Sequence, residues 1–187
     1  MKHYTHGKIA ALKVGRGSVE ARVAGLIVDV RTRQNKKGGT MGFATLDDNS
    51  GRLECALFGD VYETYRSLLS KDSVLIAEGG LAIDNFSGNL RLTVEKLYDI
   101  DQAREQFARG LQITWELSKS INNLTEQLAE VLTPFKKGGC PVSIAYRSDQ
   151  ARAVVQLGDE WRVHPTDGLL VRLKALLGTD AVEIRYR

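Results

Sequence analysis

The order of apolar runs and turn signals most constrains how this chain folds. Three β-type runs come first, a short helical stripe follows, and two more β-type runs come after it. Alternating apolar residues favour half-buried strands, and the dense turn residues at 47–51 predict a hairpin over 40–58. The predicted strands are 23–27, 41–46, 52–58, 73–81 and 90–94, and the predicted helix is 61–69 with Asp60 as its cap.

This element order is that of the OB-fold, a small Greek-key β-barrel that binds oligonucleotides. In such a barrel the first strand is long and bent, and Gly25 would ease the bend. The loops at 33–39 and 84–89 would flank the binding face. We therefore predict an OB-fold domain at 21–98, preceded by a leader or linker at 1–20.

A second pattern follows a connecting helix within 99–110. It predicts a small α+β domain at 111–187, whose last helix is rich in leucine, capped by Thr166 and stopped by Gly178. The predicted strands are 111–117, 142–147, 151–157, 161–163 and 181–186, and the predicted helices are 121–132 and 169–177. The fold class is thus a β-barrel followed by a small α+β domain.

Composition sets the broad class of the protein. The formal charge of +3 permits a nucleic-acid partner without requiring one. Cys55 and Cys140 are far apart in sequence and lack metal-ligand spacing, so we expect reduced thiols. No apolar run reaches the roughly 18 residues of a membrane span, and the start lacks a signal-peptide core. We expect a soluble, cytoplasmic protein that does not engage a membrane.

Basic residues gather where the first barrel loop is predicted. Arg31, Arg33, Lys36 and Lys37 precede a flexible pair of glycines. In an ordinary hairpin such cations only keep the tip solvated. Beside an OB-fold face they can follow phosphates and release counterions, and we predict that role here.

Aromatic residues decide whether nucleic-acid bases can stack on the barrel. Phe43 and Phe86 are candidates, and Phe86 stands in a polar loop where a ring has little structural reason to be. Phe58 is more consistent with the core. Arg91, at the start of the fifth strand, is predicted to add a phosphate contact.

No pattern in the sequence indicates catalysis. Asp99 and Asp101 open a predicted helix, where acidic residues favourably face its dipole, and two-metal chemistry needs more carboxylates. His3 and His6 have no third ligand in view. We therefore predict no catalytic residue, no metal and no cofactor.

The sequence resembles the C-terminal region of the bacterial DNA polymerase III alpha subunit, from about Val23 to the end. The segments that carry the resemblance are 23–27, 45–54, 57–58, 84–88, 99–104, 108–111 and 161–167. The resemblance implies an OB domain that contacts single-stranded DNA template, followed by a domain that binds the tau subunit of the clamp loader. In the full-length protein, a DNA-directed DNA polymerase and nucleotidyltransferase of the replisome, the catalytic domains precede this region.

Trp161, Arg162, Arg172 and Tyr186 are the predicted partner-binding residues, near the last helix and the terminal strand. The family's hexapeptide that resembles a sliding-clamp motif would lie at 181–186. Ala181 replaces the glutamine that such motifs want first, so we do not expect the sliding clamp to bind there.

Two alternatives stay open from the sequence. One is a freestanding protein-interaction module with an OB-fold and no nucleic-acid role. The other is the tRNA-binding OB domain of a synthetase, which the small α+β unit disfavours because a much larger catalytic domain follows that barrel in synthetases.

Overall fold

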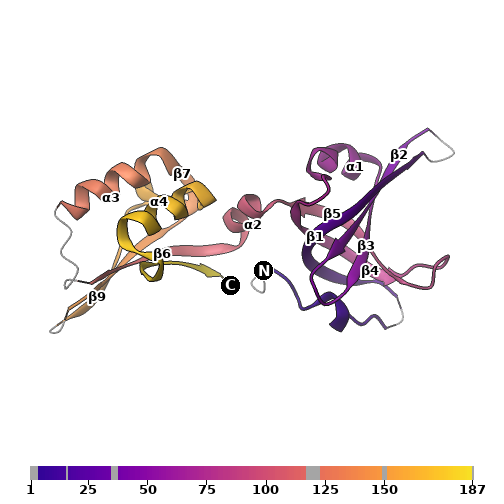
Figure 1. Ribbon diagram of the computed structural model, residues 1–187, viewed down its shortest axis with the longest axis horizontal. Coiled ribbons are helices and arrows are strands. Elements are labelled where there is room, and N and C mark those ends of the chain that lie inside the picture. The colour runs from indigo at the N-terminus through magenta and orange to yellow at the C-terminus, as the bar shows by residue number, and fades with distance from the viewer. Residues whose placement is uncertain (1–3, 16, 35–37, 117–122, 149–150, 187) are drawn as a thin grey trace. The chain divides into compact units, whose positions relative to one another are not determined.

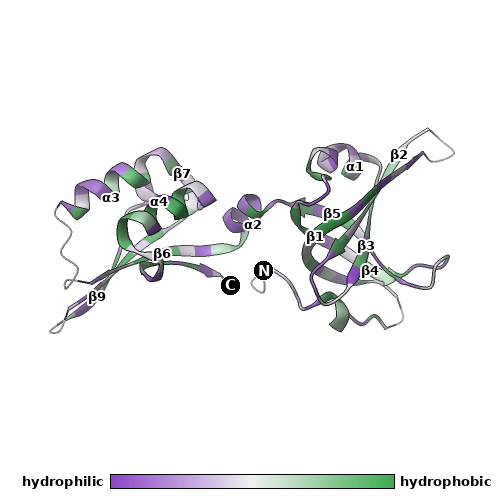
Figure 2. Cartoon of the chain, in the orientation of Figure 1, coloured by the Kyte–Doolittle hydropathy of each residue, from purple (hydrophilic) through white to green (hydrophobic). Residues whose placement is uncertain are grey.

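The computed structural model describes residues 4–15, 17–34, 38–116, 123–148 and 151–186. The chain divides into two compact units, Met1–Ile100 and Asp101–Arg187, and each has its own hydrophobic core (Figure 1). Figure 2 shows hydrophobic residues concentrated along the strands of both units. Among the described residues, no helix is long and apolar enough to cross a membrane.

The first unit is a closed barrel with the strand order β1-β2-β3-β5-β4. Helix α1 lies between β3 and β4 in the chain, so the predicted OB-fold is confirmed. The strands are β1 (Val19–Gln34), β2 (Thr40–Asp47), β3 (Arg52–Phe58), β4 (Val74–Ile83) and β5 (Leu90–Tyr98).

Strand β1 closes the barrel because it pairs with two partners in turn. Its first half pairs with β4 and its second half with β2, and the register shifts between Ile27 and Asp29. At Gly25 a Cβ atom would lie 2.9 Å from the backbone oxygen of Asp47. Glycine is therefore needed there for close backbone packing, and the register irregularity lies a few residues further along the strand.

Helix α1 of the first unit differs from the sequence prediction at its start and at its end. Helix α1 (Gly59–Tyr65) has Phe58 at its N-cap position without a side-chain cap, so the predicted cap by Asp60 is wrong. Asp60 lies inside the first turn, because Gly59, with φ of 50°, turns the chain directly from β3 into the helix. A short 3-10 turn, Arg66–Leu68, follows.

Residues 4–15, which the sequence suggested to be part of a leader or linker, pack against the barrel. Ile9 is buried in the barrel core, and its backbone N–H donates to Asp48 Oδ2 at 2.9 Å. The next backbone N–H, of Ala10, donates to Ser50 Oγ at 3.2 Å. The β2–β3 turn thus anchors this segment, which contains a 3-10 turn at Ile9–Ala11.

The second unit is a four-stranded sheet of order β10-β6-β8-β9, with α3 and α4 on one face (Figure 1). Strands β6 and β8 are parallel, and α3 lies in the connection between them. The elements are α2 (Ile100–Phe107), β6 (Ala108–Glu116), α3 (Leu124–Leu132), β7 (Lys136–Cys140), β8 (Val142–Arg147), β9 (Arg152–Gln156), α4 (Asp167–Leu177) and β10 (Val182–Tyr186). The predicted α+β class is confirmed.

Helix α4 begins and ends as the sequence predicts. The Thr166 side chain accepts a hydrogen bond from the Leu169 backbone N–H, and Gly178 ends the helix at φ of 94°. Arg104 of α2 forms ion pairs with Asp101 at 2.7 Å and with Asp167 at 2.6 Å. Helix α2 therefore belongs to the second unit.

The segment around Trp161 differs from the prediction of a short strand at 161–163. It forms a 3-10 turn, Asp159–Trp161, and Val163 makes isolated bridges to Lys136 and Cys140. The bridging strand β7 was not predicted, because its sequence Lys-Lys-Gly-Gly-Cys has no apolar alternation. A Cβ atom at Gly138 would lie 2.1 Å from the backbone of Val163, so this contact depends on glycine.

Candidate nucleic-acid interface

A pocket of about 450 Å³ opens on the surface of the barrel. Five of the seven residues predicted to bind nucleic acid line it, namely Arg31, Arg33, Phe43, Phe86 and Arg91. Glu54, Ser87, Asn89 and Leu90 complete the lining. Lys36 and Lys37 lie outside the described residues.

Strand register brings these side chains together. Arg31 on β1 pairs with Phe43 on β2, and Glu54 on β3 pairs with Arg91 on β5. The β3–β5 pairing is parallel and closes the barrel. The pocket therefore depends on the β3–β5 pairing, because Arg31 and Arg91, 60 positions apart in the chain, come together only across β1, β2, β3 and β5.

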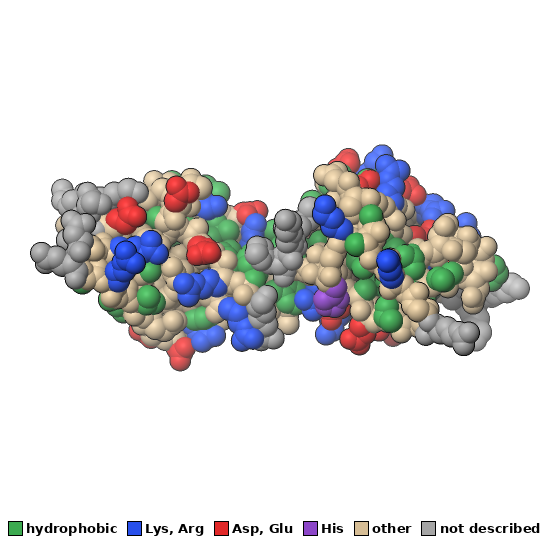
Figure 3. Space-filling model, turned by 90° about the horizontal axis from the view of Figure 1, so that it is seen from below, with side chains coloured by type: hydrophobic (Ala, Val, Ile, Leu, Met, Phe, Trp, Pro, Cys, Tyr) green, Lys and Arg blue, Asp and Glu red, His purple; other side chains and the backbone are tan. Residues whose placement is uncertain are grey.

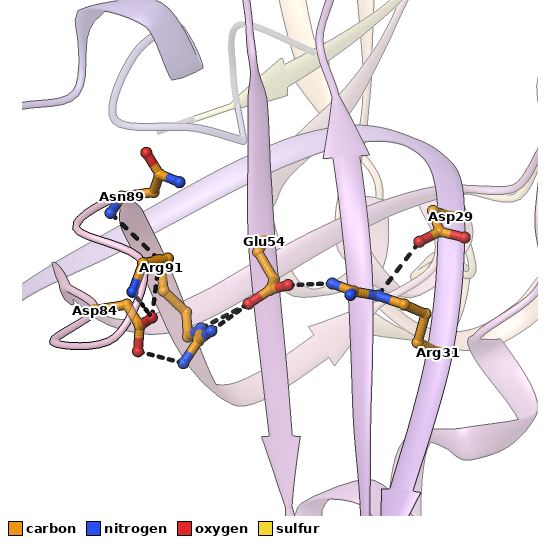
Figure 4. A network of polar contacts seen from close by, with 7 residues as sticks. Asp29, Arg31, Glu54, Asp84, Asn89 and Arg91 are labelled. Carbon is orange, nitrogen blue, oxygen red and sulfur yellow. Dashed lines mark hydrogen bonds and ion pairs between the residues drawn. The ribbon is translucent and has the colours of Figure 1, made fainter.

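An ion-pair network fixes two of the cations (Figure 4). Arg91 Nη2 lies 2.6 Å from Glu54 Oε1, and Arg91 Nη1 lies 2.5 Å from Asp84 Oδ1. Arg31 pairs with the other oxygen of Glu54 and lies 3.4 Å from Asp29. Two guanidinium groups thus face three carboxylates. Their charge is compensated within the site, and Arg33 forms no ion pair with the described residues.

Asp84 also shapes the β4–β5 loop. Its carboxylate accepts hydrogen bonds from the Ser87 backbone N–H at 2.9 Å and the Ser87 hydroxyl at 2.8 Å. Those hydrogen bonds, together with the positive charge of Arg91, lower the pKa of Asp84 below its ordinary value. The Asp84 N–H donates to the Asn89 carbonyl, which closes the loop. The loop thus presents Phe86 from a hydrogen-bonded frame.

The aromatic rings of the site differ in exposure. Phe86 is 99% exposed, whereas Phe43 is half-buried and meets Phe58 edge-to-face at 6.3 Å between centroids. The Arg91 guanidinium carbon lies 5.7 Å from the Phe43 centroid. Phe58 is 41% exposed, so its assignment to the core is wrong. Phe86 is free to stack on a base, while Phe43 offers a ring already flanked by a cation.

Sequence reasoning missed the acidic partners of this site. Asp29, Glu54 and Asp84 each read as ordinary surface residues of strands or turns. Only the position of Glu54 in the alternating β3 pattern, on the face away from the core, gave a local signal. Its pairing with Arg91, 37 positions away, has none.

Three of the four predicted partner-binding residues surround one corner of the second unit. The Lys136 ammonium lies 3.2 Å from the Trp161 ring centroid, and the Arg172 guanidinium lies 5.4 Å from that of Phe135. Arg162 donates to the Gly139 carbonyl at 2.8 Å and pairs with Asp159 at 3.1 Å. Tyr186 lies elsewhere, near the end of edge strand β10. The described residues contain no group of acidic, histidine and cysteine side chains arranged to hold a metal.

Comparison with known proteins finds a matching family model for part of each unit. Residues 127–178 match the family described as DNA polymerase III subunit alpha, C-terminal domain, and residues 21–100 match the OB-fold nucleic acid binding domain. The DNA polymerase III subunit alpha of Haemophilus influenzae is 38% identical over 186 residues, which is 100% of this chain and 16% of that protein. Its Escherichia coli K12 counterpart is 42% identical over 171 residues, or 91% of this chain and 15% of that protein.

The chain resembles the C-terminal region of the DNA polymerase III alpha subunit. The resemblance predicted from the sequence is therefore confirmed, and the alignment with the Haemophilus protein covers the whole chain, residues 1–20 included. The chain spans about one sixth of the length of these relatives.

Among solved structures, the second OB-fold domain of replication protein A from Methanococcus maripaludis is similar, with a TM-score of 0.39 and 18% identity. The match covers 50% of this chain and 93% of that one. The fold assignment rests on the strand topology itself.

Proposed function

We propose that this chain is the non-catalytic C-terminal part of a bacterial replicative DNA polymerase alpha subunit. Its barrel binds single-stranded DNA template, and its second unit binds the tau subunit of the clamp loader. The barrel pocket carries the first part of the proposal, because it joins an exposed ring, Phe86, to Arg33, a cation that forms no ion pair within the described part of the chain. Rings for bases and cations for phosphates are the two things a single-strand site needs.

The ion pairs of the pocket indicate different roles for its cations. Arg31 and Arg91 are held by carboxylates, so they act as positioning residues that flank Phe43 and shape the pocket. Net attraction for phosphates comes from Arg33, near the end of β1, together with Lys36 and Lys37, which follow it in the sequence by three and four positions. Each phosphate contact releases counterions and carries no base information. Binding is therefore strong at low salt and indifferent to sequence.

The second part of the proposal rests on family membership and on the corner around Trp161. A half-buried tryptophan beside cations is a common anchor of protein interfaces. Polymerisation belongs to other parts of the full-length protein. We expect this chain alone to extend no primer with or without magnesium, and template-dependent incorporation by a pure preparation would contradict that.

The DNA-binding part is tested by replacing Arg33, Lys36 and Lys37 with Ala in the whole chain. The slope of log affinity against log salt for a labelled oligonucleotide should fall by about 0.7 per lost contact, so by about 2 in all. A matched control replaces Lys71, Lys137 and Lys174, three exposed lysines outside the pocket, and should keep the slope. Equal slopes for both variants would contradict DNA binding by the barrel.

The partner-binding part is tested by reversing charge at Arg162 and Arg172 in the whole chain. Capture by immobilised tau should be lost, while oligonucleotide binding is kept. Unchanged capture by tau would remove these residues from the docking surface. If the unaltered chain captures tau but binds no oligonucleotide, the chain is instead a protein-interaction module without a nucleic-acid role.

A further inference from the structure

The face of the second unit's sheet that α3 and α4 leave open carries a pocket of its own. It has a volume of about 260 Å³ and extends over all four strands. Its lining includes Gln112, Ala145, Arg147, Arg152, Val154 and Arg185. Figure 3 views the unit from the side opposite these helices and shows basic side chains spread across it, with several acidic side chains between them.

Among the described residues, the arginines of this pocket differ from Arg31 and Arg91 of the barrel, which carboxylates hold in place. Arg147, Arg152 and Arg185 form no ion pair with any of the described residues. Two acidic residues also lie on this face, because Glu183 pairs with Gln112 in the β10–β6 register and Glu116 pairs with Arg147 in the β6–β8 register. Arg147 and Arg152 pair across β8 and β9, whereas Arg185 pairs with Gly110, six residues along β6 from Glu116, the partner of Arg147. Adjacent strands lie about 4.8 Å apart and each residue rises about 3.3 Å, so Arg185 lies roughly 14 Å across the sheet and roughly 20 Å along it from Arg152. Cations spread this widely over one face suit a polyanion better than a single carboxylate.

A buried side-chain oxygen in the lining of the pocket is the second observation that points to a ligand. Gln112 is only 6% exposed, and no group of the described residues donates a hydrogen bond to its Oε1. A buried acceptor without a partner costs about 1–3 kcal/mol. A ligand that brings an N–H donor to this position would recover that cost.

We propose that this open sheet face is a second binding site for single-stranded nucleic acid, separate from the barrel pocket. The arginine forks take the phosphates. A base lies on the apolar floor formed by Ala145 and the 66%-exposed Val154, and donates an N–H to Gln112 Oε1. The open face of a four-stranded sheet is a known platform for single strands, because it supports several nucleotides at once.

The same chemistry disfavours an acidic peptide as the ligand. An extended peptide satisfies its backbone along a sheet edge, here the outer side of β9, whereas this pocket lies across the face of the strands. A nucleic acid presents phosphates and base N–H groups to a face without needing the edge.

The test uses the whole chain and a labelled oligodeoxynucleotide of about 10 residues. Replacing Arg147, Arg152 and Arg185 with Gln removes three phosphate contacts. The gain in affinity from lowering salt from about 0.2 M to about 0.05 M should then shrink by about 18-fold. The control variant, in which Lys71, Lys137 and Lys174 are replaced, should keep the full increase in affinity at low salt. Replacement of the three arginines by Lys should restore part of it, because the charge returns without the fork.

The same measurement in a chain that also carries Arg33→Ala and Phe86→Ala separates the two sites. The arginine effect should persist there, even if the barrel proves not to bind DNA at all. An equal loss in the lysine control would reduce the effect to net charge and overturn the proposal. Displacement of the oligonucleotide by polyglutamate at equal charge concentration would overturn it in favour of an acidic protein segment.

The Gln112→Met variant distinguishes a binding role of Gln112 from a structural role, because the two roles predict different changes in melting temperature and oligonucleotide affinity. It removes the unpaired amide at similar length, so the melting temperature should stay the same or rise, while oligonucleotide affinity falls. The Gln112 side-chain amide resonance should also shift during titration of the unaltered chain. If Gln112→Met binds the oligonucleotide as tightly as the unaltered chain, and the Gln112 amide resonance does not shift on titration, the oligonucleotide does not bind in this pocket.

Discussion

Phe86 offers the sharpest separation of binding from stability in this chain. Its ring is 99% exposed, so it contributes almost nothing to the packing of the barrel. Phe86→Ala should therefore change the free energy of unfolding by less than about 0.5 kcal/mol. Stacking of one base on the ring is worth about 1–3 kcal/mol. Since 1.4 kcal/mol is a factor of ten, single-strand affinity should fall between about 5-fold and 150-fold.

The assay is fluorescence anisotropy of a labelled oligothymidylate, with thermal unfolding measured on the same samples. Phe86→Trp keeps an aromatic face and should retain most of the affinity, whereas Phe86→Leu keeps apolar area without a ring and should behave like the alanine variant. Val171→Ala removes another exposed apolar side chain, 66% exposed on α4, and should change neither quantity.

Three results would contradict this reasoning. Equal affinity of the alanine variant and the unaltered chain would mean that the ring does not stack. Equal affinity of the leucine and tryptophan variants would mean that the ring acts only as apolar area. A drop in melting temperature of several degrees would show that Phe86 supports the loop at 84–89.

Three further predictions concern stability and thiol chemistry. Thr166→Ala removes the α4 cap and should cost about 1 kcal/mol, seen as a fall of about 4–8 °C in the melting temperature of the second unit, with exposed Thr179→Ala as the control. Burial raises the pKa of Cys55 to about 12 and that of Cys140 to about 11, so iodoacetamide at pH 8 should modify both only after unfolding; rapid labelling of the folded chain would contradict this. Asp84 has a lowered pKa, so its stabilising effect is present above the ordinary value of 3.8 and is lost as pH falls through the lower folded value. Asp84→Asn should therefore destabilise the barrel at pH 7 and flatten its acid unfolding below pH 4, and parallel acid curves would contradict the assignment.

Local patterns in the sequence specify the secondary-structure elements and their order. Alternation in 41–46 and 52–58, the turn at 47–51 and the leucine stripe after Thr166 are local patterns, and local patterns fix strands, turns and caps. Because few topologies accommodate three strands, a helix and two strands, that order also predicted the barrel. Phe86 was predictable as a binding candidate for the same reason, since a ring in a polar loop is a local anomaly.

Tertiary structure alone decided which charges are free. Arg31, Arg33 and Arg91 look alike in sequence, yet Glu54 and Asp84 compensate two of them, while Arg33 has no ion pair with the residues that the structure describes. Those ion pairs follow from the closing register of β3 with β5, which no local pattern encodes. Strand β7 likewise exists because Val163 bridges it, with glycine allowing the approach. Contacts between distant segments depend on register and backbone proximity, and these arise only when the whole chain has closed around its cores.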